Sequence, residues 1–317
     1  MSIEVVRYTP EHEIAWDHFC AEAHNATLLH TRRFLSYHGQ RFKDRSLLIF
    51  MDGKLAGVFP AAESPSDPEM VVSHPGATYG GLVHQGRLSG AGMIDALSAI
   101  AEHYKRAESY RKIQYKAVPY IFTKKPVQDD SYALFRLHAQ RIRCDLSCTI
   151  DLADRGAVSE RRKRGLKKAL KVVELSSDGS LLPELWHVIA HNLARKHDAR
   201  PVHSLNELTL LRERFPREMV IRSALIAGKV EAGVVFFNSH KSWHAQYIAA
   251  SEAAYAVSAL DAVFDSAIRE AEMAGARYFD FGTSNEEAGL VLNDGLYRFK
   301  SEFGGGGVAH EYYELEL

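Results

Sequence analysis

Two stretches of the chain, residues 46–60 and 221–237, share one pattern of apolar and polar positions. Each has an apolar run, a Gly-Lys turn and a second run that opens on Gly-Val, as in SLLIFMDGKLAGVFP and IRSALIAGKVEAGVVFF. A short turn with glycine between two apolar runs predicts a β-hairpin. The pattern therefore predicts the same hairpin in both halves of the chain, with turns at Gly53-Lys54 and Gly228-Lys229.

The elements that follow each hairpin also correspond in order. A strand-and-turn stretch (71–83) or a strand (242–251) precedes a helix whose apolar residues recur on one face. Each half then has a strand, a helix and a final strand of alternating residues. We predict helices over 89–108, 132–142, 256–274 and 290–302, and strands over 113–119, 144–152, 276–282 and 309–317. The fold class is therefore α/β, with two tandem domains of mixed, twisted sheets flanked by helices.

A polar connector that contains a glycine, residues 153–159, separates the two halves. It predicts an N-terminal domain over 1–152 and a C-terminal domain over 160–317. The length of 317 residues agrees with two domains.

Behind the connector, the stretch 161–171 holds seven Lys or Arg residues and no acid. Such a run predicts either a solvated helix or a contact with an anionic ligand, CoA phosphates or tRNA. A further helix is expected to start at Pro183, and another behind the capping box Ser204–Glu207.

The composition argues against several classes of protein. With 39 basic and 40 acidic residues, the chain has no global charge that would favour nucleic acid or a membrane as partner. The start MSIEVVRYTPEHE shows no signal peptide, and no apolar run approaches the ~20 residues of a membrane-spanning helix. Cys20, Cys144 and Cys148 are too few and too scattered for a disulfide framework or a zinc site. We expect a reduced, cytoplasmic protein without a metal.

The most informative segment is residues 276–317. A strand over 278–281 meets a polar turn, Gly282-Thr283-Ser284-Asn285, and an amphipathic helix follows. A polar turn between a strand and a helix is a common ligand site in α/β enzymes. Asp280 lies in mid-strand, where a carboxylate is costly unless it is paired. We expect it to anchor the turn Ser284-Asn285 or a lysine rather than to act as a base.

The residues Phe299-Lys300 and Phe303-Gly304, close after Asp280-Phe281-Gly282, resemble the C-terminal signature of the FemAB-like branch of the GNAT acyltransferases. The order of elements in each half resembles a GNAT fold, so the resemblance to a tandem GNAT protein covers the whole chain. It implies transfer of an acyl group from acyl-CoA, the donor substrate, to an amine. The second half has the better-formed site.

In GNAT enzymes two neighbouring strands splay apart to receive the pantetheine, and the next helix start receives the pyrophosphate. The resemblance assigns the two strands to 233–238 and 243–249. It assigns the helix start to Ala256, Val257, Ser258 and Ala259. The family signature Gln/Arg-x-x-Gly-x-Gly/Ala is absent there, where the sequence reads SEAAYAVSA. Further donor-binding residues are expected at Gly282, Ser284 and Asn285.

The candidate catalytic residues are His244, Lys300 and Asp280. Histidine titrates near neutral pH, so His244 is either the base for the attacking amine or a hydrogen-bonded histidine that shapes the pocket. The resemblance implies that Lys300 stabilises an oxyanion or a phosphate; the alternative is a lysine at the rim of an amphipathic helix. In the strand 243–249 we expect Trp243, Ala245 and Tyr247 on one face and His244, Gln246 and Ile248 on the other.

The candidate acceptor-binding residues come from both halves: His74, Tyr79, Arg32, Arg33, His203, Gln246 and Tyr247. His74 and Tyr79 belong to the stretch SHPGATYGG, whose glycines allow a ligand close to the backbone; a purely structural hairpin is the alternative. Arg32 or Arg33 has paired N–H donors suited to a diphosphate. His203 directly precedes a capped helix.

Within the tandem class, HTRRFLSYH, SHPGATYGGL, PVHSL and HAQYIA resemble nucleotide-sugar N-acyltransferases of surface-polysaccharide (lipopolysaccharide O-antigen) synthesis. This resemblance implies transfer of an acetyl or 3-hydroxybutanoyl group from acyl-CoA to the amine of a dTDP-linked 3-amino-3,6-dideoxyhexose. The first alternative is an aminoacyl-tRNA-dependent peptidoglycan aminoacyltransferase of the FemAB type. The second is a binding protein whose sites are degenerate.

Overall fold

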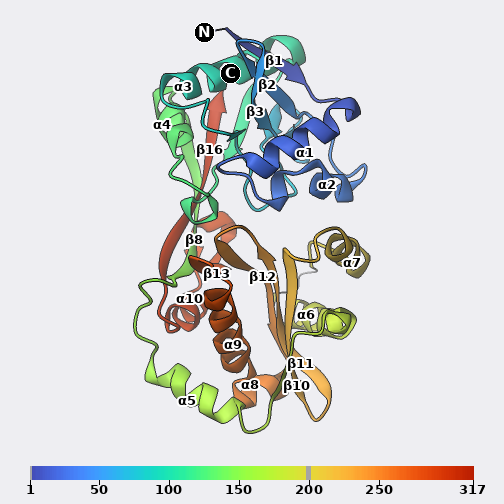
Figure 1. Ribbon diagram of the computed structural model, residues 1–317, viewed down its shortest axis with the longest axis vertical. Coiled ribbons are helices and arrows are strands. Elements are labelled where there is room, and N and C mark those ends of the chain that lie inside the picture. The colour runs from blue at the N-terminus through green and yellow to red at the C-terminus, as the bar shows by residue number, and fades with distance from the viewer. Residues whose placement is uncertain (1, 198–200) are drawn as a thin grey trace. The chain divides into compact units, whose positions relative to one another are not determined.

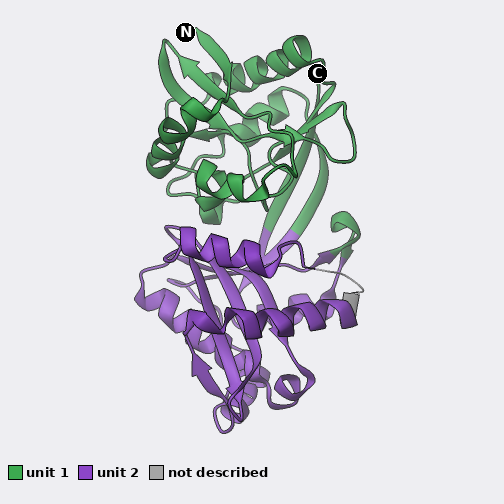
Figure 2. Ribbon diagram, turned by 90° about the vertical axis from the view of Figure 1, so that its right-hand side faces the viewer, with its two compact units in different colours: residues 1–145, 286–291, 309–317 green, residues 146–285, 292–308 purple. Residues whose placement is uncertain are grey.

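The computed structural model describes residues 2–197 and 201–317, which form two compact units (Figure 2). Unit 1 comprises Met1–Asp145, Glu286–Val291 and Ala309–Leu317, and unit 2 comprises Leu146–Asn285 and Leu292–Val308. The units are not the two continuous halves that the sequence suggests. Strands β8 (Gln140–Asp151) and β16 (Gly306–Glu316) each contribute residues to both.

Unit 1 contains an antiparallel sheet with the order β1-β2-β3-β6 and a second, mixed set of strands. In the second set β4 pairs with β5, β5 runs parallel to β7, and β16 runs antiparallel to β7. The strands are β1 (Ile3–Arg7), β2 (Leu47–Met51), β3 (Lys54–Phe59), β4 (Ala62–Glu63), β5 (Met70–Val72), β6 (Val83–His84) and β7 (Lys112–Lys116).

The helices of unit 1 are α1 (Glu13–Glu22), α2 (Arg32–Leu35), α3 (Ala91–Glu108) and α4 (Asp129–Arg136). The apolar stripe of α3 packs as its periodicity predicts. Met93, Leu97 and Ile100 are buried in one cluster with Leu47 and Ile49 of β2.

Unit 2 is built on a sheet with the strand order β8-β13-β12-β11-β10-β9. Its neighbours are antiparallel except for β12 and β13, which run parallel. The strands besides β8 are β9 (Glu174–Ser176), β10 (Met219–Ile226), β11 (Lys229–Asn238), β12 (Ser242–Ala250) and β13 (Tyr278–Thr283).

Helices cover both faces of this sheet. Helices α6 (Leu182–His197) and α7 (Leu205–Arg214) lie on one face and α9 (Ala259–Met273) on the other (Figure 1). The α9 side holds the main core, in which Phe264 of α9 packs with Phe236 and Phe279 of the strands. The remaining elements are α5 (Glu160–Ala169), α8 (Glu252–Val257), α10 (Asp294–Ser301) and the short ribbon of β14 (Asn285–Glu286) and β15 (Val291–Leu292). No helix in the described part of the chain is long and apolar enough to cross a membrane.

Both hairpins are confirmed, as β2–β3 and β10–β11. The capping box is also confirmed, because the Ser204 side chain accepts from the Glu207 N–H and the Glu207 carboxylate accepts from the Ser204 N–H.

Three expected helix boundaries are wrong. The helix over 132–142 ends at Arg136, because His138 adopts a left-handed conformation and the chain then enters β8. The helix over 290–302 begins only at Asp294, where Asn293 caps it, because the preceding residues form the β14–β15 ribbon. The helix over 256–274 is two helices, α8 and α9, broken at Ser258, whose φ is 61°.

Candidate active site

A β-bulge in β12 sets the positions of the candidate side chains. Val235 of β11 is paired with Tyr247 and the next residue, Phe236, with Ala245, so Gln246 is the extra residue. A bulge of one residue reverses the alternation beyond it. Ile248 therefore packs into the same core as Trp243 and Ala245.

Tyr247, by contrast, contacts Trp186 of α6 on the opposite face, so the expected grouping of Tyr247 with Trp243 and Ala245 is wrong. Sequence alternation missed the bulge because it assumes an uninterrupted period of two. The bulge places His244 and Tyr247 on one face of β12.

The strands that part from one another are β12 and β13. Their parallel ladder pairs Ser242 with Tyr278 and ends at His244 and Asp280. Beyond this pair Gly282 takes a φ of 76°, and the pairing of β13 with β8 also shifts. The expectation that 233–238 and 243–249 splay apart is wrong, because these segments are the hairpin neighbours β11 and β12, paired over their whole length.

His244 and Asp280 form a direct pair at the end of the ladder. The His244 Nδ1 lies 2.5 Å from Asp280 Oδ2. Asp280 is fully buried, and its other oxygen accepts from the Ser147 hydroxyl and, at 2.6 Å, from the Thr149 hydroxyl. The Gly282 N–H lies 3.3 Å from Oδ2. A buried carboxylate with this many donors is stabilised in its ionised form.

This pairing fixes the role of the imidazole. A carboxylate at Nδ1 orients the ring and favours the tautomer with the proton on Nδ1, so Nε2 is the nitrogen that can take up a proton. The partners Ser147 and Thr149 were missed by sequence reasoning. Their spacing in CDLSCTIDL, two hydroxyls on one face of a predicted strand, was the available signal.

Lys300 of α10 binds the end of β13. Its Nζ donates to the carbonyl oxygens of Gly282, at 2.9 Å, and Thr283, at 2.7 Å. Burial lowers the pKa of Lys300 to about 8, against the opposing effect of the Asp280 charge. The lysine is therefore tied to the backbone beside the His244–Asp280 pair.

The polar turn after β13 is bound to β8 and α10. The Ser284 N–H donates to Leu146 O, the Asn285 side chain accepts from the Leu146 N–H at 2.6 Å, and the Asn293 N–H donates to Ser284 O. Main-chain and amide groups thus anchor this turn, whereas Asp280 is engaged with β8 hydroxyls and His244.

The four residues expected at a helix start, Ala256–Ala259, lie at the junction of two helices. Ala256 and Val257 end α8, Ser258 donates its N–H back to α8, and Ala259 is the buried first residue of α9. The helix that directly follows β12 is α8, which starts at Glu252 behind the cap Ser251. The first helix after β12 thus begins earlier than expected, at Glu252. The long helix α9 begins at Ala259, within the expected residues.

His203 and Tyr247 come together in unit 2. The Tyr247 hydroxyl lies 2.6 Å from His203 Nδ1, and burial raises the pKa of Tyr247 to about 12. Trp186 packs edge-on against the Tyr247 ring. Tyr247 and His244 thus give one face of β12 two polar pairs, each with its own partner, while Gln246 occupies the bulge between them.

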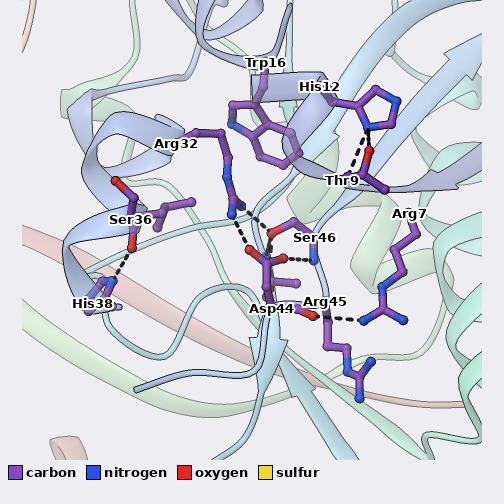
Figure 3. A network of polar contacts seen from close by, with 12 residues as sticks. Arg7, Thr9, His12, Trp16, Arg32, Ser36, His38, Asp44, Arg45 and Ser46 are labelled. Carbon is purple, nitrogen blue, oxygen red and sulfur yellow. Dashed lines mark hydrogen bonds and ion pairs between the residues drawn. The ribbon is translucent and has the colours of Figure 1, made fainter. Parts of the chain in front are cut away.

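The other candidate acceptor residues lie in unit 1. Arg32 is buried and points toward Asp44 and Ser46 (Figure 3). Its guanidinium group also stacks on the Tyr8 ring. Arg33 is exposed, and its N–H donates to Asp17.

His74 and Tyr79 are packed inside unit 1. The His74 ring stacks on His38, and burial holds its pKa well below the usual value. The Tyr79 hydroxyl donates to Thr27, and its ring stacks on Phe122. In the described residues no three His, Cys, Asp or Glu side chains are placed to hold a metal ion.

A family of known proteins matches the part of the chain that contains this site. Residues 155–301 match the family described as Acetyltransferase (GNAT) domain, a match that includes His244, Asp280 and Lys300. No protein of curated function matches the sequence.

Several solved structures share the fold. FemX has a TM-score of 0.70 and 12% identity and covers 99% of this chain and 97% of that chain. The L-PGS of Bacillus licheniformis has a TM-score of 0.61 and 14% identity over 98% of this chain and 92% of that chain. A tandem GNAT protein of the clavulanic acid biosynthesis pathway has a TM-score of 0.52 and 12% identity, over 99% and 98%. The chain therefore has a tandem GNAT-type fold, and the match of residues 155–301 to a GNAT acetyltransferase domain supports an acyltransferase.

Proposed function

We propose that the protein transfers an acyl group, acetyl or 3-hydroxybutanoyl, from acyl-CoA to the amine of a dTDP-linked amino-dideoxy sugar. The observation that carries the proposal is the His244–Asp280 pair at the end of the β12–β13 ladder. It provides a proton acceptor at the end of the parallel β12–β13 ladder of unit 2. Main-chain groups of diverging strands suit the amide groups of a pantetheine.

The reaction is a direct attack on the thioester. His244 Nε2 takes a proton from the ammonium form of the acceptor, and Asp280 stabilises the imidazolium that results. The free amine nitrogen then bonds to the thioester carbon, and the C–S bond breaks. The imidazolium of His244 gives its proton to the departing thiolate, which leaves as free thiol. Neutral His244 then takes the proton that the new amide nitrogen loses and releases it to solvent. The Ser147 and Thr149 hydroxyls hold Asp280 throughout.

Lys300 has a positioning role in this scheme. A lysine ammonium has three N–H donors, and two of them are used by the Gly282 and Thr283 carbonyls. Lys300 thereby fixes the turn that follows Asp280. The acceptor side is formed by His203, Gln246 and Tyr247 in unit 2. The nucleotide-sugar acceptor is supported by the sequence resemblance alone.

An aminoacyl-tRNA-dependent transfer is the second candidate. It is favoured by the similarity to FemX, which extends over 99% of this chain. The same His244–Asp280 chemistry would apply, since an ester carbonyl would replace the thioester. The two candidates therefore differ in the donor and not in the base.

A thiol-release assay over a panel of acyl-CoA donors and dTDP-amino sugars tests the proposal. We expect turnover with at least one pair, and a loss of more than about tenfold in kcat for His244→Gln, with a changed pH–rate profile. His18→Gln, at an exposed histidine of α1, is the matched control.

Absence of thiol release together with activity that RNase abolishes would establish the aminoacyl-tRNA alternative. An unchanged pH–rate profile in His244→Gln would remove His244 as the base. Binding of ligands by calorimetry with no transfer to any acceptor would indicate a binding protein.

A further inference from the structure

The C-terminal end of α5 forms, with α8, a surface that combines lysines with exposed apolar side chains. The helices are in contact, and both lie at the end of unit 2 shown lowest in Figure 1. We call this surface the α5 patch, and its members are Arg164, Lys167, Lys168, Leu170, Lys171, Val172 and Tyr255.

The basic run divides into an inner and an outer set. Arg162 is buried, where it pairs with Asp261 and Glu302 and lies over the Phe299 ring, so it holds α5 against α9 and α10. Lys163 pairs with Glu160. Arg162 is therefore part of the internal structure of unit 2, whereas Lys163 and Glu160 form an exposed pair, and the exposed Arg161 lies 4.0 Å from Glu302.

The outer set has no such partners. Arg164, Lys167, Lys168 and Lys171 are exposed, and none of them forms an ion pair within residues 2–197 and 201–317. The carboxylates near α5 are engaged elsewhere, since Glu160, Asp261 and Glu302 bind Lys163 and Arg162, and Glu252 binds Arg195. Glu160, Glu252 and Glu174 are exposed as well, and the first two are paired with Lys163 and Arg195.

Large apolar side chains are exposed among these cations. Leu170 is 59% exposed, Val172 51% and Tyr255 45%. Leu170 caps the helix directly between Lys168 and Lys171, so charge and apolar surface alternate at the same tip. Burial of these groups in a partner is favourable, because apolar surface leaves water.

We propose that the α5 patch binds the surface of an anionic lipid bilayer. Lysines at a bilayer are attracted by acidic headgroups, leucine and valine enter the acyl boundary, and tyrosine is favoured at the interface. Nucleic acid matches the charge but offers no apolar phase for Leu170 and Val172. The near-zero net charge of the chain conceals this local patch, because the excess of acid lies elsewhere in the sequence.

The inference is tested by vesicle flotation with the full chain. Vesicles of phosphatidylcholine alone are compared with vesicles that also contain phosphatidylglycerol. We expect binding to the anionic vesicles only, and weaker binding as salt is raised. The variant Lys167→Gln/Lys168→Gln/Lys171→Gln should bind about a hundredfold more weakly, about fivefold for each lysine.

The matched control is Lys54→Gln/Lys105→Gln/Lys125→Gln, which removes the same charge from exposed positions of unit 1 and should bind as the wild type does. Leu170→Ser/Val172→Ser should also weaken vesicle binding. Thiol release with soluble substrates should be equal in all these variants, so this test is independent of the proposed reaction. Equal losses in the two lysine variants, or tRNA binding that depends on the three lysines but not on Leu170, would overturn the proposal.

Discussion

Units 1 and 2 each contain one corresponding pair of parallel strands, but the chain that follows the pair is arranged differently in the two units. In unit 1, β5 and β7 are parallel and α3 connects them; in unit 2, β12 and β13 are parallel and are connected through α8 and α9. In each unit the pair follows a β-hairpin, as the duplicated sequence pattern predicts.

The difference lies just beyond the ladder. In unit 1 the loop after β5 turns back onto β7: the Ser73 N–H donates to Gln114 O and the Gly80 N–H donates to Lys116 O. The Lys116 N–H in turn donates to the Ser73 hydroxyl. The loop thus occupies the edge of β7.

In unit 2, β13 turns away at Gly282, and its following residues are bound by Lys300 and β8. The polar pair His244–Asp280 lies at that point. One topology thus supports a closed form in unit 1 and an elaborated form in unit 2, and the proposed chemistry uses the elaborated form.

The largest expected effect is a difference in kcat between substitutions of two buried aspartates, one in each unit. Asp280 of unit 2 binds His244, whereas Asp130 of unit 1 accepts from the Tyr115 hydroxyl at 2.8 Å. We expect Asp280→Asn to lower kcat about a thousandfold, since it removes the charge that stabilises the imidazolium. Asp130→Asn should leave kcat unchanged. Steady-state kinetics measure both, and equal losses would refute the assignment of chemistry to unit 2.

The loop that closes the edge of β7 should be intolerant of a side chain at Gly80. A Cβ there would lie 1.7 Å from Ser73 O, a backbone atom that cannot move aside cheaply. Gly80→Ala should therefore lower the free energy of unfolding by about 3 kcal/mol. Gly306→Ala, where a Cβ meets no atom within 4 Å, is the control and should be neutral. Chemical denaturation measures both free energies of unfolding. An unchanged value for Gly80→Ala would show that the loop is not fixed at this position.

Each unit contains a buried lysine bound to carbonyl oxygens, and the one in unit 1 gives a pH signature. Lys116 donates to His74 O and Ala77 O, and burial lowers its pKa to about 7. Between this value and the ordinary pKa of lysine, the unfolded chain binds the extra proton, so stability rises with pH. Between pH 7 and 9, the free energy of unfolding of the wild type should rise by about 2 kcal/mol relative to that of Lys116→Met.

Denaturation across this range tests the prediction, with Lys105→Met, at an exposed position, as the control. If the difference in the free energy of unfolding between the wild type and Lys116→Met does not change with pH, Lys116 stays protonated in the folded protein. The pKa of Lys300, lowered to about 8, predicts a similar but later rise for unit 2.

The smallest effect should come from the hydroxyls behind Asp280. Ser147→Ala removes one of its donors and should lower kcat about tenfold, or about 1.4 kcal/mol. The midpoint of the pH–rate profile should shift in Ser147→Ala, because the Asp280 carboxylate loses a hydrogen bond that stabilises it. Ser98→Ala, whose hydroxyl donates to Ile94 O within α3, is the control. A loss in kcat without any shift of the profile would argue that Ser147 acts through packing alone.

Sequence patterning predicted the elements better than their pairings. The two hairpins and the apolar stripe of α3 depend on local periodicity, and they are confirmed. The bulge at Gln246 was missed, since nothing in the alternation of HAQYIA marks an extra residue. The misassigned splayed strands have the same cause, because strand order in space is set by tertiary packing.

The proximity of the candidate catalytic residues was predicted in part. His244, Asp280 and Lys300 were named from their residue types and the resemblance, and the structure brings them together within a few residues of the ladder's end. Their partners could not be inferred, because Ser147 and Thr149 reach Asp280 only through the antiparallel pairing of β8 with β13. The ion pair of Arg32 with Asp44 likewise could not be inferred, because the two residues are separated in the sequence and meet only in the folded unit 1.

Strand β16 has a consequence for how the protein is made. Its residues from Tyr312 to Glu316 pair with β7, so the N-terminal unit lacks one strand until they have emerged from the ribosome. Most of unit 2 is synthesised earlier than this strand. The portion of the protein that is translated first is therefore completed last, and a nascent chain stalled before residue 312 would expose an unpaired edge of β7 to other chains.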